Sequence, residues 1–124
     1  MNEITLSVPH AILFVNDPAH RHVEIPEYVQ GQVTSANASC VSVSTRADVD
    51  GDVTVRLGVT LLECGQGECN TVVEHCIDTP GRSVGVFTSE NKMILMMEVR
   101  CETARLTIAV DDAESPALIC IAVQ

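Results

Sequence analysis

Apolar and polar residues alternate along most of this chain, and a period of two is typical of strands that bury one face. The longest example runs through Val53, Val55, Leu57, Val59 and Leu61. Valine, isoleucine and threonine, whose branched β-carbons favour extended backbone, account for 36 of the 124 residues. We therefore expect an all-β protein of about eight or nine strands. The segments that carry the pattern are 4–8, 41–45, 53–61, 71–77, 84–86, 93–99, 106–110 and 118–123.

The breaks between these segments contain the residues that turns require. Asp50-Gly51 suits a two-residue hairpin, because glycine adopts a positive φ without strain, and further turns are expected at 79–81 and 89–91. At most one short helix is expected, near 26–30, with a proline at its start. Without helices to connect parallel strands, we expect an antiparallel β-sandwich or flattened barrel, in one domain spanning 1–124.

The charge balance excludes some classes of ligand. Seventeen acidic residues against seven lysines and arginines leave a net charge of −10. Such a field repels phosphate backbones and attracts basic proteins, so nucleic acid is not expected as a direct ligand. No apolar run approaches the roughly 18 residues of a membrane-spanning helix, and Glu3 stands where an export signal carries a basic residue. We expect a cytoplasmic protein without membrane association.

Four candidate zinc ligands, Cys64, Cys69, His75 and Cys76, fall within thirteen residues. His75 and Cys76 are neighbours in a strand and face opposite sides of a sheet, so at most one can join the two cysteines. Cys64 and Cys69 remain open as metal ligands, a redox-sensitive pair or plain hairpin residues. Most of the six cysteines are expected to be buried thiols in a reducing cytosol, and no metal or cofactor is expected.

Other motifs give weaker signals. The alternating carboxylates of 48–52 resemble the start of a calcium loop, but Val53 and Val59 stand where that loop needs glycine and glutamate. The His-Arg-His-Val-Glu segment at 20–24 would place two imidazoles and a carboxylate on one edge, although a solvated loop explains it more simply. The chain has no nucleophile elbow, phosphate loop or dinucleotide fingerprint, so no enzymatic activity is expected. The strand at 93–99 is dense enough in apolar residues to be buried on both faces.

The distribution of charge along the turns is more informative. Consecutive antiparallel strands place their turns at alternating ends, so the turns at 64–69, 89–92 and 111–116 should share one end. That end would carry six carboxylates against Lys92, and they are the candidate partner-binding residues: Glu63, Glu68, Glu90, Asp111, Asp112 and Glu114. The opposite end should mix both signs through Asp48, Asp50, Asp52, Asp78, Glu102, Arg46, Arg82 and Arg100.

The order of these elements resembles the family of DNA-entry nuclease inhibitors of the competence protein J type. The resembling stretches are Leu6–His10, Leu13–Val15, Ile25–Gly31, Val41–Ser44, Arg82–Thr88, Met93–Val99 and Ala104–Val110. The resemblance implies a small β-rich cytosolic protein that binds and silences a nuclease. The chain has Arg100–Thr103 where a Gly-Asp-Tyr-like turn is expected, so no binding residues are carried over from the family.

These observations lead to one main hypothesis and two alternatives. The main hypothesis is a non-catalytic acidic protein-binding domain, an inhibitor or immunity-type partner of a basic nuclease or toxin. The first alternative is a small metal- or redox-responsive Cys/His protein. The second is a homo-oligomeric structural module such as a homodimer, because the segment 117–123 has few charges to prevent pairing if it forms an edge strand.

Overall fold

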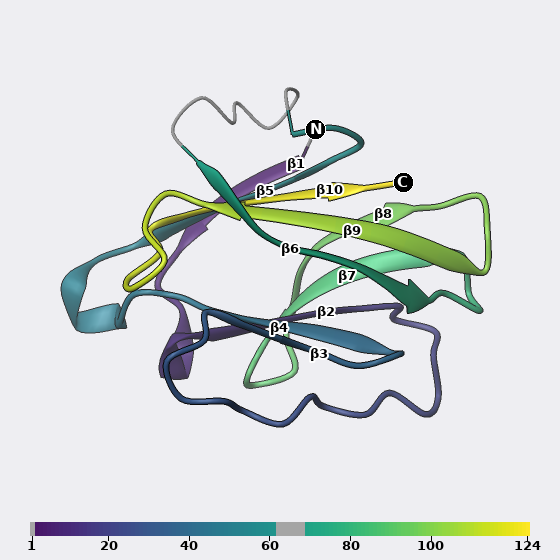
Figure 1. Cartoon of the computed structure of the whole chain (residues 1–124), viewed down its shortest axis with the longest axis horizontal. Coiled ribbons are helices and arrows are strands. Elements are labelled where there is room, and N and C mark those ends of the chain that lie inside the picture. The colour runs from purple at the N-terminus through teal and green to yellow at the C-terminus, as the bar shows by residue number, and fades with distance from the viewer. Residues whose placement is uncertain (1, 62–68) are drawn as a thin grey trace.

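The computed structural model describes residues 2–61 and 69–124, which form ten strands in two five-stranded sheets (Figure 1). Sheet A has the strand order β1 (Asn2–Leu6), β5 (Val53–Gly58), β10 (Leu118–Val123), β9 (Thr103–Val110) and β6 (Asn70–Asp78). Sheet B has the order β3 (Thr34–Ala36), β4 (Cys40–Ser44), β2 (Ile12–Asn16), β7 (Ser83–Thr88) and β8 (Met93–Glu98). The expected all-β sandwich is confirmed.

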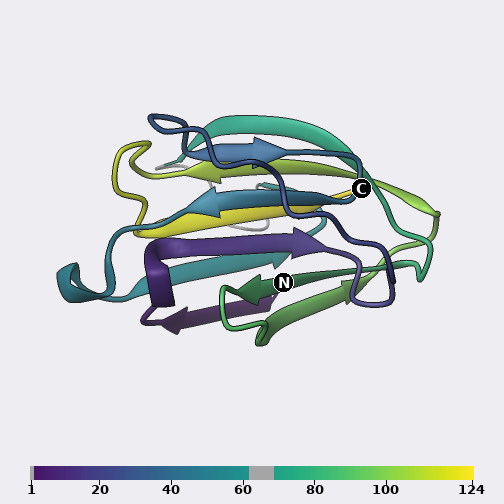
Figure 2. The same ribbon diagram turned by 90° about the horizontal axis from the view of Figure 1, so that it is seen from below.

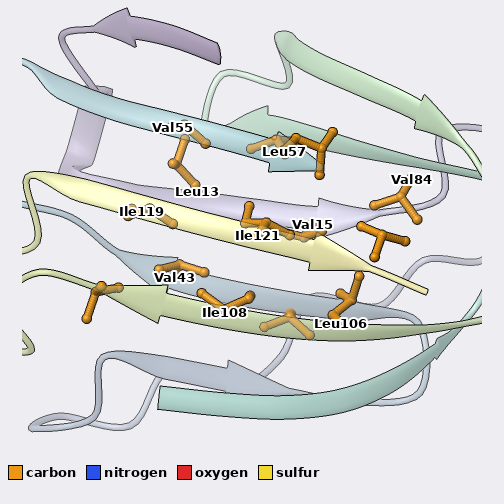
Figure 3. Close-up of a cluster of buried hydrophobic side chains, with 14 of the residues drawn as sticks. Leu13, Val15, Val43, Val55, Leu57, Val84, Leu106, Ile108, Ile119 and Ile121 are labelled. Carbon is orange, nitrogen blue, oxygen red and sulfur yellow. The ribbon is translucent and has the colours of Figure 1, made fainter. Parts of the chain in front are cut away.

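Alternation along the strands builds one apolar core between the two sheets (Figure 3). Sheet A contributes side chains such as Leu106, Ile108 and Ile121, and sheet B contributes Leu13 and Val43, all fully buried. Removing one such side chain from water stabilises the fold by about 1.5–3 kcal/mol. The core is aliphatic, because the three aromatic residues of the chain lie outside this cluster.

Strand pairing is antiparallel throughout the described residues except for β5 and β10, which run parallel with Val55 opposite Ile119. The segment 117–123 is therefore not an edge strand, as one alternative required, but lies inside sheet A. The strand at 93–99 was expected to be buried on both faces, yet β8 is an edge strand. Its Met93 and Met96 side chains are 44% and 43% exposed.

The short helix considered near 26–30 does not form; this segment is irregular and ends in a turn in which the Gln32 N–H donates to the Val29 carbonyl. Backbone groups of the connection bond to side chains of β3 and of the β3–β4 turn instead. The Asn37 side-chain amide donates to the Glu24 carbonyl, the Glu24 N–H donates to Ser39 Oγ, and Ser35 Oγ donates to the Glu27 carbonyl. The helical segments in the described residues are two single 3-10 turns, η1 (Pro9–Ala11) and η2 (Asp48–Asp50), and no helix among them is long and apolar enough to cross a membrane.

The hairpin expected at Asp50-Gly51 is wrong, because this turn connects the two sheets. β4 belongs to sheet B and β5 to sheet A, so the strands before and after the turn do not pair. Gly51 does adopt a positive φ of 127°. Alternation located eight of the ten strands, missing β2 and β3 and extending β5 past its end at Gly58, and it contained no information about the sheet to which each strand belongs.

The registers between paired strands show at which end of the sandwich each loop lies. β5 ends at Gly58, opposite Ala122, whereas β6 begins at Asn70, opposite Val110 at the other end of sheet A. The chain therefore changes ends between these two strands, which breaks the simple alternation of turns. As a result, the loops 45–52, 89–92 and 111–117 all lie at one end (Figure 1).

Candidate functional site

Three loops bring seven exposed carboxylates together at one end of the sandwich. We call this set the acidic end, and its members are Asp48, Asp50, Asp52, Glu90, Asp111, Asp112 and Glu114. Arg46 and Lys92 are the lysines and arginines in the same three loops. Four of the six candidate partner-binding residues therefore lie at one end, as expected, and their role in binding stays a prediction. The other two, Glu63 and Glu68, lie outside the described residues.

The placement of Asp48, Asp50 and Asp52 at the opposite end is wrong. The η2 loop is joined to the loop before β10 by a 2.9 Å hydrogen bond from the Arg46 N–H to the Pro116 carbonyl. The two turns at the opposite end carry two negative and two positive charges, which balance: Asp78, Glu102, Arg82 and Arg100. The contrast in charge between the two ends is therefore larger than the sequence indicates.

The side chain of Arg46 stabilises the η2 loop from inside. Its Nε donates to the Asp52 carbonyl at 2.8 Å, and Nη2 donates to the same oxygen. Gly51 suits this turn because its φ of 127° is one that residues with a side chain rarely adopt, and a Cβ there would lie 2.8 Å from Nη2 and displace the guanidinium. Because the guanidinium is engaged inside its own loop, it is poorly placed to neutralise the carboxylates of the other loops.

The tip of the η2 loop exposes an apolar side chain among the carboxylates. Val49 is 88% exposed and lies between Asp48 and Asp50. A 2.9 Å hydrogen bond from the Asp50 N–H to the Ala47 carbonyl closes the turn beneath it. An apolar group presented on an ordered loop is suited to anchor a protein interface after long-range attraction has brought the partner close.

A strained turn connects the β7–β8 hairpin to the rest of the acidic end. His10 and Ala11 adopt left-handed φ values of 59° and 55°, which are costly for residues other than glycine. His10 Nδ1 and Ser89 Oγ share a 2.7 Å hydrogen bond, and the Ala11 carbonyl accepts from the Thr45 N–H at 2.9 Å. No sequence motif marked His10, because its role depends on a contact with a residue far along the chain.

The carboxylates of the β9–β10 loop differ in the hydrogen bonds that they accept. Asp111 Oδ1 accepts from the Ala117 and Leu118 N–H groups at 3.0 and 3.1 Å, so it shapes the loop. Asp112 Oδ1 accepts from the Glu114 N–H at 2.9 Å. Glu114 is the member of this loop whose carboxylate makes no hydrogen bond within the described residues. Substitutions that probe charge should therefore avoid Asp111.

The cysteine and histidine cluster considered for zinc is arranged differently from the expectation. Cys64 lies outside the described residues, and Cys69 Sγ lies 4.0 Å from Cys120 Sγ on β10. His75 Nε2 donates to the Asn37 carbonyl at 2.7 Å, which connects the two sheets. Cys76, the next residue, is exposed. Within the described part of the chain, no three metal-binding side chains are close enough to share an ion.

The segment 20–24 also uses its groups locally. His20 Nδ1 accepts a 3.0 Å hydrogen bond from the His22 N–H, and both backbone groups of Glu24 bond to side chains before β4. These contacts shape the connection that runs across sheet B. They match the simpler interpretation of a solvated loop, since Arg21, His22 and Glu24 are exposed.

Cys40 is a buried thiol beneath this connection. Val41 and Val43 of β4 point into the core, and successive residues of a strand face opposite sides. Cys40 therefore faces the outer side of sheet B, where it has no exposed surface. Burial raises the pKa of the Cys40 thiol to about 12, although a hydrogen bond with the Val15 backbone opposes the shift. At neutral pH Cys40 is therefore a protonated thiol without nucleophilic character.

This pKa predicts a loss of stability in alkali. Below pH 9 both the folded and the unfolded states keep the Cys40 proton, and above pH 9 only the unfolded state loses it. The free energy of unfolding should therefore fall between pH 9 and pH 12, by up to about 4 kcal/mol from this group. Urea titrations across this range should show a shallower fall for Cys40→Ala than for the wild type. Parallel curves for the two proteins would contradict the assignment.

Comparisons with known proteins give one similarity, at the level of the fold. No family model and no curated protein matches the chain. Among solved structures, the crystal structure of ComJ, inhibitor of the DNA degrading activity of NucA, from Bacillus subtilis, superposes with a TM-score of 0.63. The match covers 99% of this chain and 94% of that chain at 10% sequence identity. The resemblance seen in the order of elements is thus confirmed as a shared fold.

Proposed function

We propose that this protein is a non-catalytic inhibitor or immunity-type partner of a basic nuclease or toxin, acting in the cytoplasm through its acidic end. The observation that carries the proposal is the presence of seven exposed carboxylates, from three loops, at one end of the sandwich, with the exposed Val49 in one of these loops. The fold is shared with ComJ, which inhibits the DNA degrading activity of NucA, and this supports a nuclease as the class of partner.

The geometry provides a mechanism for inhibition. A nuclease holds the phosphate backbone of its substrate in a positively charged groove, and a clustered negative surface competes for that groove. Attraction between the two surfaces accelerates encounter, and apolar contacts such as those available to Val49 then slow dissociation. Hydrogen bonds already order the three loops, so little conformational entropy is lost on binding.

An inhibition assay tests the proposal directly. The purified protein is mixed with the NucA-type nuclease encoded in the same genome, and degradation of linear DNA is followed over time. We expect degradation to slow in proportion to added protein and to stop near a one-to-one ratio, with a complex visible by gel filtration. Unchanged degradation at tenfold molar excess, with separate elution of the two proteins, would refute the proposal. Gel filtration of the protein alone also reports whether it forms a homodimer.

A further inference from the structure

A groove with a volume of about 540 Å³ crosses the outer face of sheet B, away from the core. Phe14 of β2 and Phe87 of β7 contribute from the sheet, and Pro18, Val23 and Ile25 contribute from the connection between β2 and β3. Polar groups complete the lining: Asn16, His20, Thr88, Ser89 and Asn91. A volume of this size accommodates one or two side chains of a bound peptide.

The wall of the groove is fixed in place rather than loose. Figure 2 shows the connection from β2 to β3 running across the face of sheet B. At its start, the buried Asp17 carboxylate accepts from the Ala19 and Gly81 N–H groups. Further along, the backbone of Glu24 bonds to Ser39 and Asn37 as described above. The groove is therefore preformed, and a ligand would not have to order it.

Apolar side chains remain exposed on this fixed wall. Ile25, Tyr28 and Val29 are 61%, 66% and 43% exposed, whereas Pro26 between them is buried. All three aromatic residues of the chain thus lie in the groove or on the segment that forms its wall. Aromatic and large aliphatic side chains in a hollow are the composition of interface centres that bind tightly.

The groove is continuous with the acidic end. Thr88, Ser89 and Asn91 line it and belong to the same hairpin turn as Glu90. Apart from Arg21, the exposed charged residues close in sequence to its lining residues are Glu24 and Glu27 on the wall and Glu90 and Lys92 in the turn, which leaves an excess of negative charge. Arg21, the cation of this segment, instead lines a separate hollow with Asp78 and Glu102. The border of the groove is therefore negative, which complements a basic segment.

We propose that this groove is the second half of the docking surface and receives an apolar side chain flanked by lysines or arginines. The segment would belong to the same basic protein that the acidic end engages, so the inference rests on the proposed function. Under this division, the acidic end sets the rate of association and the groove sets the rate of dissociation and the sequence preference of the contact.

Short peptides test the groove without the whole partner. The probes are Lys-Lys-Phe-Lys-Lys and Lys-Lys-Ala-Lys-Lys with blocked termini, titrated into the labelled protein and followed by NMR chemical shifts. We expect the phenylalanine peptide to bind about tenfold more tightly, because its ring is buried in the groove. Its shifts should centre on Phe14, Phe87 and Thr88, which line the groove.

Single substitutions test whether the preference for the phenylalanine peptide arises in the groove. Ile25→Ser, at a position 61% exposed and therefore tolerant of change, should remove most of the preference for the phenylalanine peptide. Val59→Ser is the matched control, since Val59 is 50% exposed at the opposite end of the molecule, and it should leave the preference unchanged. Asp50→Asn should lower the affinity for both peptides by the same factor, or leave both affinities unchanged.

The outcomes separate this inference from the proposed function. Equal affinity for the two peptides, or a preference that survives Ile25→Ser, overturns the groove as a docking site, and the inhibition assay then stands by itself. A clear preference that Ile25→Ser abolishes supports the groove. If the nuclease is also uninhibited, the proposed function falls while the site for a basic apolar segment remains.

Discussion

Removing three carboxylates from the acidic end, by Asp48→Asn, Asp50→Asn and Glu114→Gln, should slow association with the inhibited nuclease at least tenfold at low salt. The three side chains are exposed and lie in two different loops of the same end. Steering depends on local charge and is screened above about 0.15 M salt, so the effect should shrink as salt is added. Stopped-flow or surface binding kinetics at several salt concentrations measure it.

The matched control removes charge from the opposite end, with Asp78→Asn and Glu102→Gln. Both residues are exposed, and Arg82 and Arg100 lie in the same two turns. This variant should associate at nearly the wild-type rate. Stability should be close to wild type in both variants, because exposed carboxylates contribute little to folding. Equal association rates for the acidic-end variant and the wild type at low salt would assign the acidic end to solubility.

Val49→Ser belongs to the same test but should change a different rate constant. Val49 carries no charge, so the substitution should leave association nearly unchanged. Loss of its apolar contact should increase the rate of dissociation several-fold, because its exposed surface is available for burial in the complex. Association and dissociation rates that both equal those of the wild type would place Val49 outside the interface.

Asp17→Ala should destabilise the fold by about 3 kcal/mol or more, the largest effect expected from a single polar substitution here. Asp17 has no exposed surface, and its carboxylate accepts from the Ala19 N–H at 2.8 Å, the Gly81 N–H at 2.6 Å and Ser83 Oγ at 3.0 Å. Truncation removes the shared acceptor of these three donors from a position that has no exposed surface. Urea unfolding measures the loss, and the melting temperature should fall by roughly 10 °C.

Two further variants separate the hydrogen bonds of Asp17 from a general effect of lost charge. Asp78→Ala removes an exposed carboxylate and should change the free energy of unfolding by less than about 0.5 kcal/mol. Gly81→Ala should reproduce part of the Asp17→Ala loss, because a Cβ at Gly81 would lie 2.4 Å from the Ala19 Cβ and 2.9 Å from Asp17 Oδ1. An Asp17→Ala protein as stable as Asp78→Ala would show that water replaces the carboxylate at no cost.

Much of the fold was predictable because strand formation has a local signature. Side chains that alternate between core and solvent must alternate in polarity, and the segment 53–61 predicted β5 and its inward face on that basis alone. β3 was missed, since its three residues Thr34–Ala36 contain no apolar alternation. The irregular, non-helical course of the chain through Glu24 and Glu27 was also missed, because its hydrogen-bond partners lie in residues 35–39.

The candidate site was only partly predictable. Counting turns correctly placed Glu90 and Glu114 at one end, because each lies in the turn of an antiparallel hairpin, β7–β8 or β9–β10, and the chain reverses direction once between the two hairpins. The same count misplaced Asp50. It assumed that consecutive strands after β4 always pair and run in opposite directions, whereas β5 and β6 are not neighbours in sheet A. Val49 and His10 carried no recognisable motif. Their roles depend on exposure and on a contact across the fold.

The sequence by itself determined the net charge of −10, the position of most strands and the aliphatic core, because each depends on residue type and on a period of two. Only the tertiary structure decided which loops meet. The sheet that a strand joins, and the end at which its turn emerges, depend on packing between segments far apart in the chain. That packing joins the loop of Asp50 to the loop of Glu114 and makes Ile25 and Phe14 line the same groove, and neither pairing leaves a trace in local sequence.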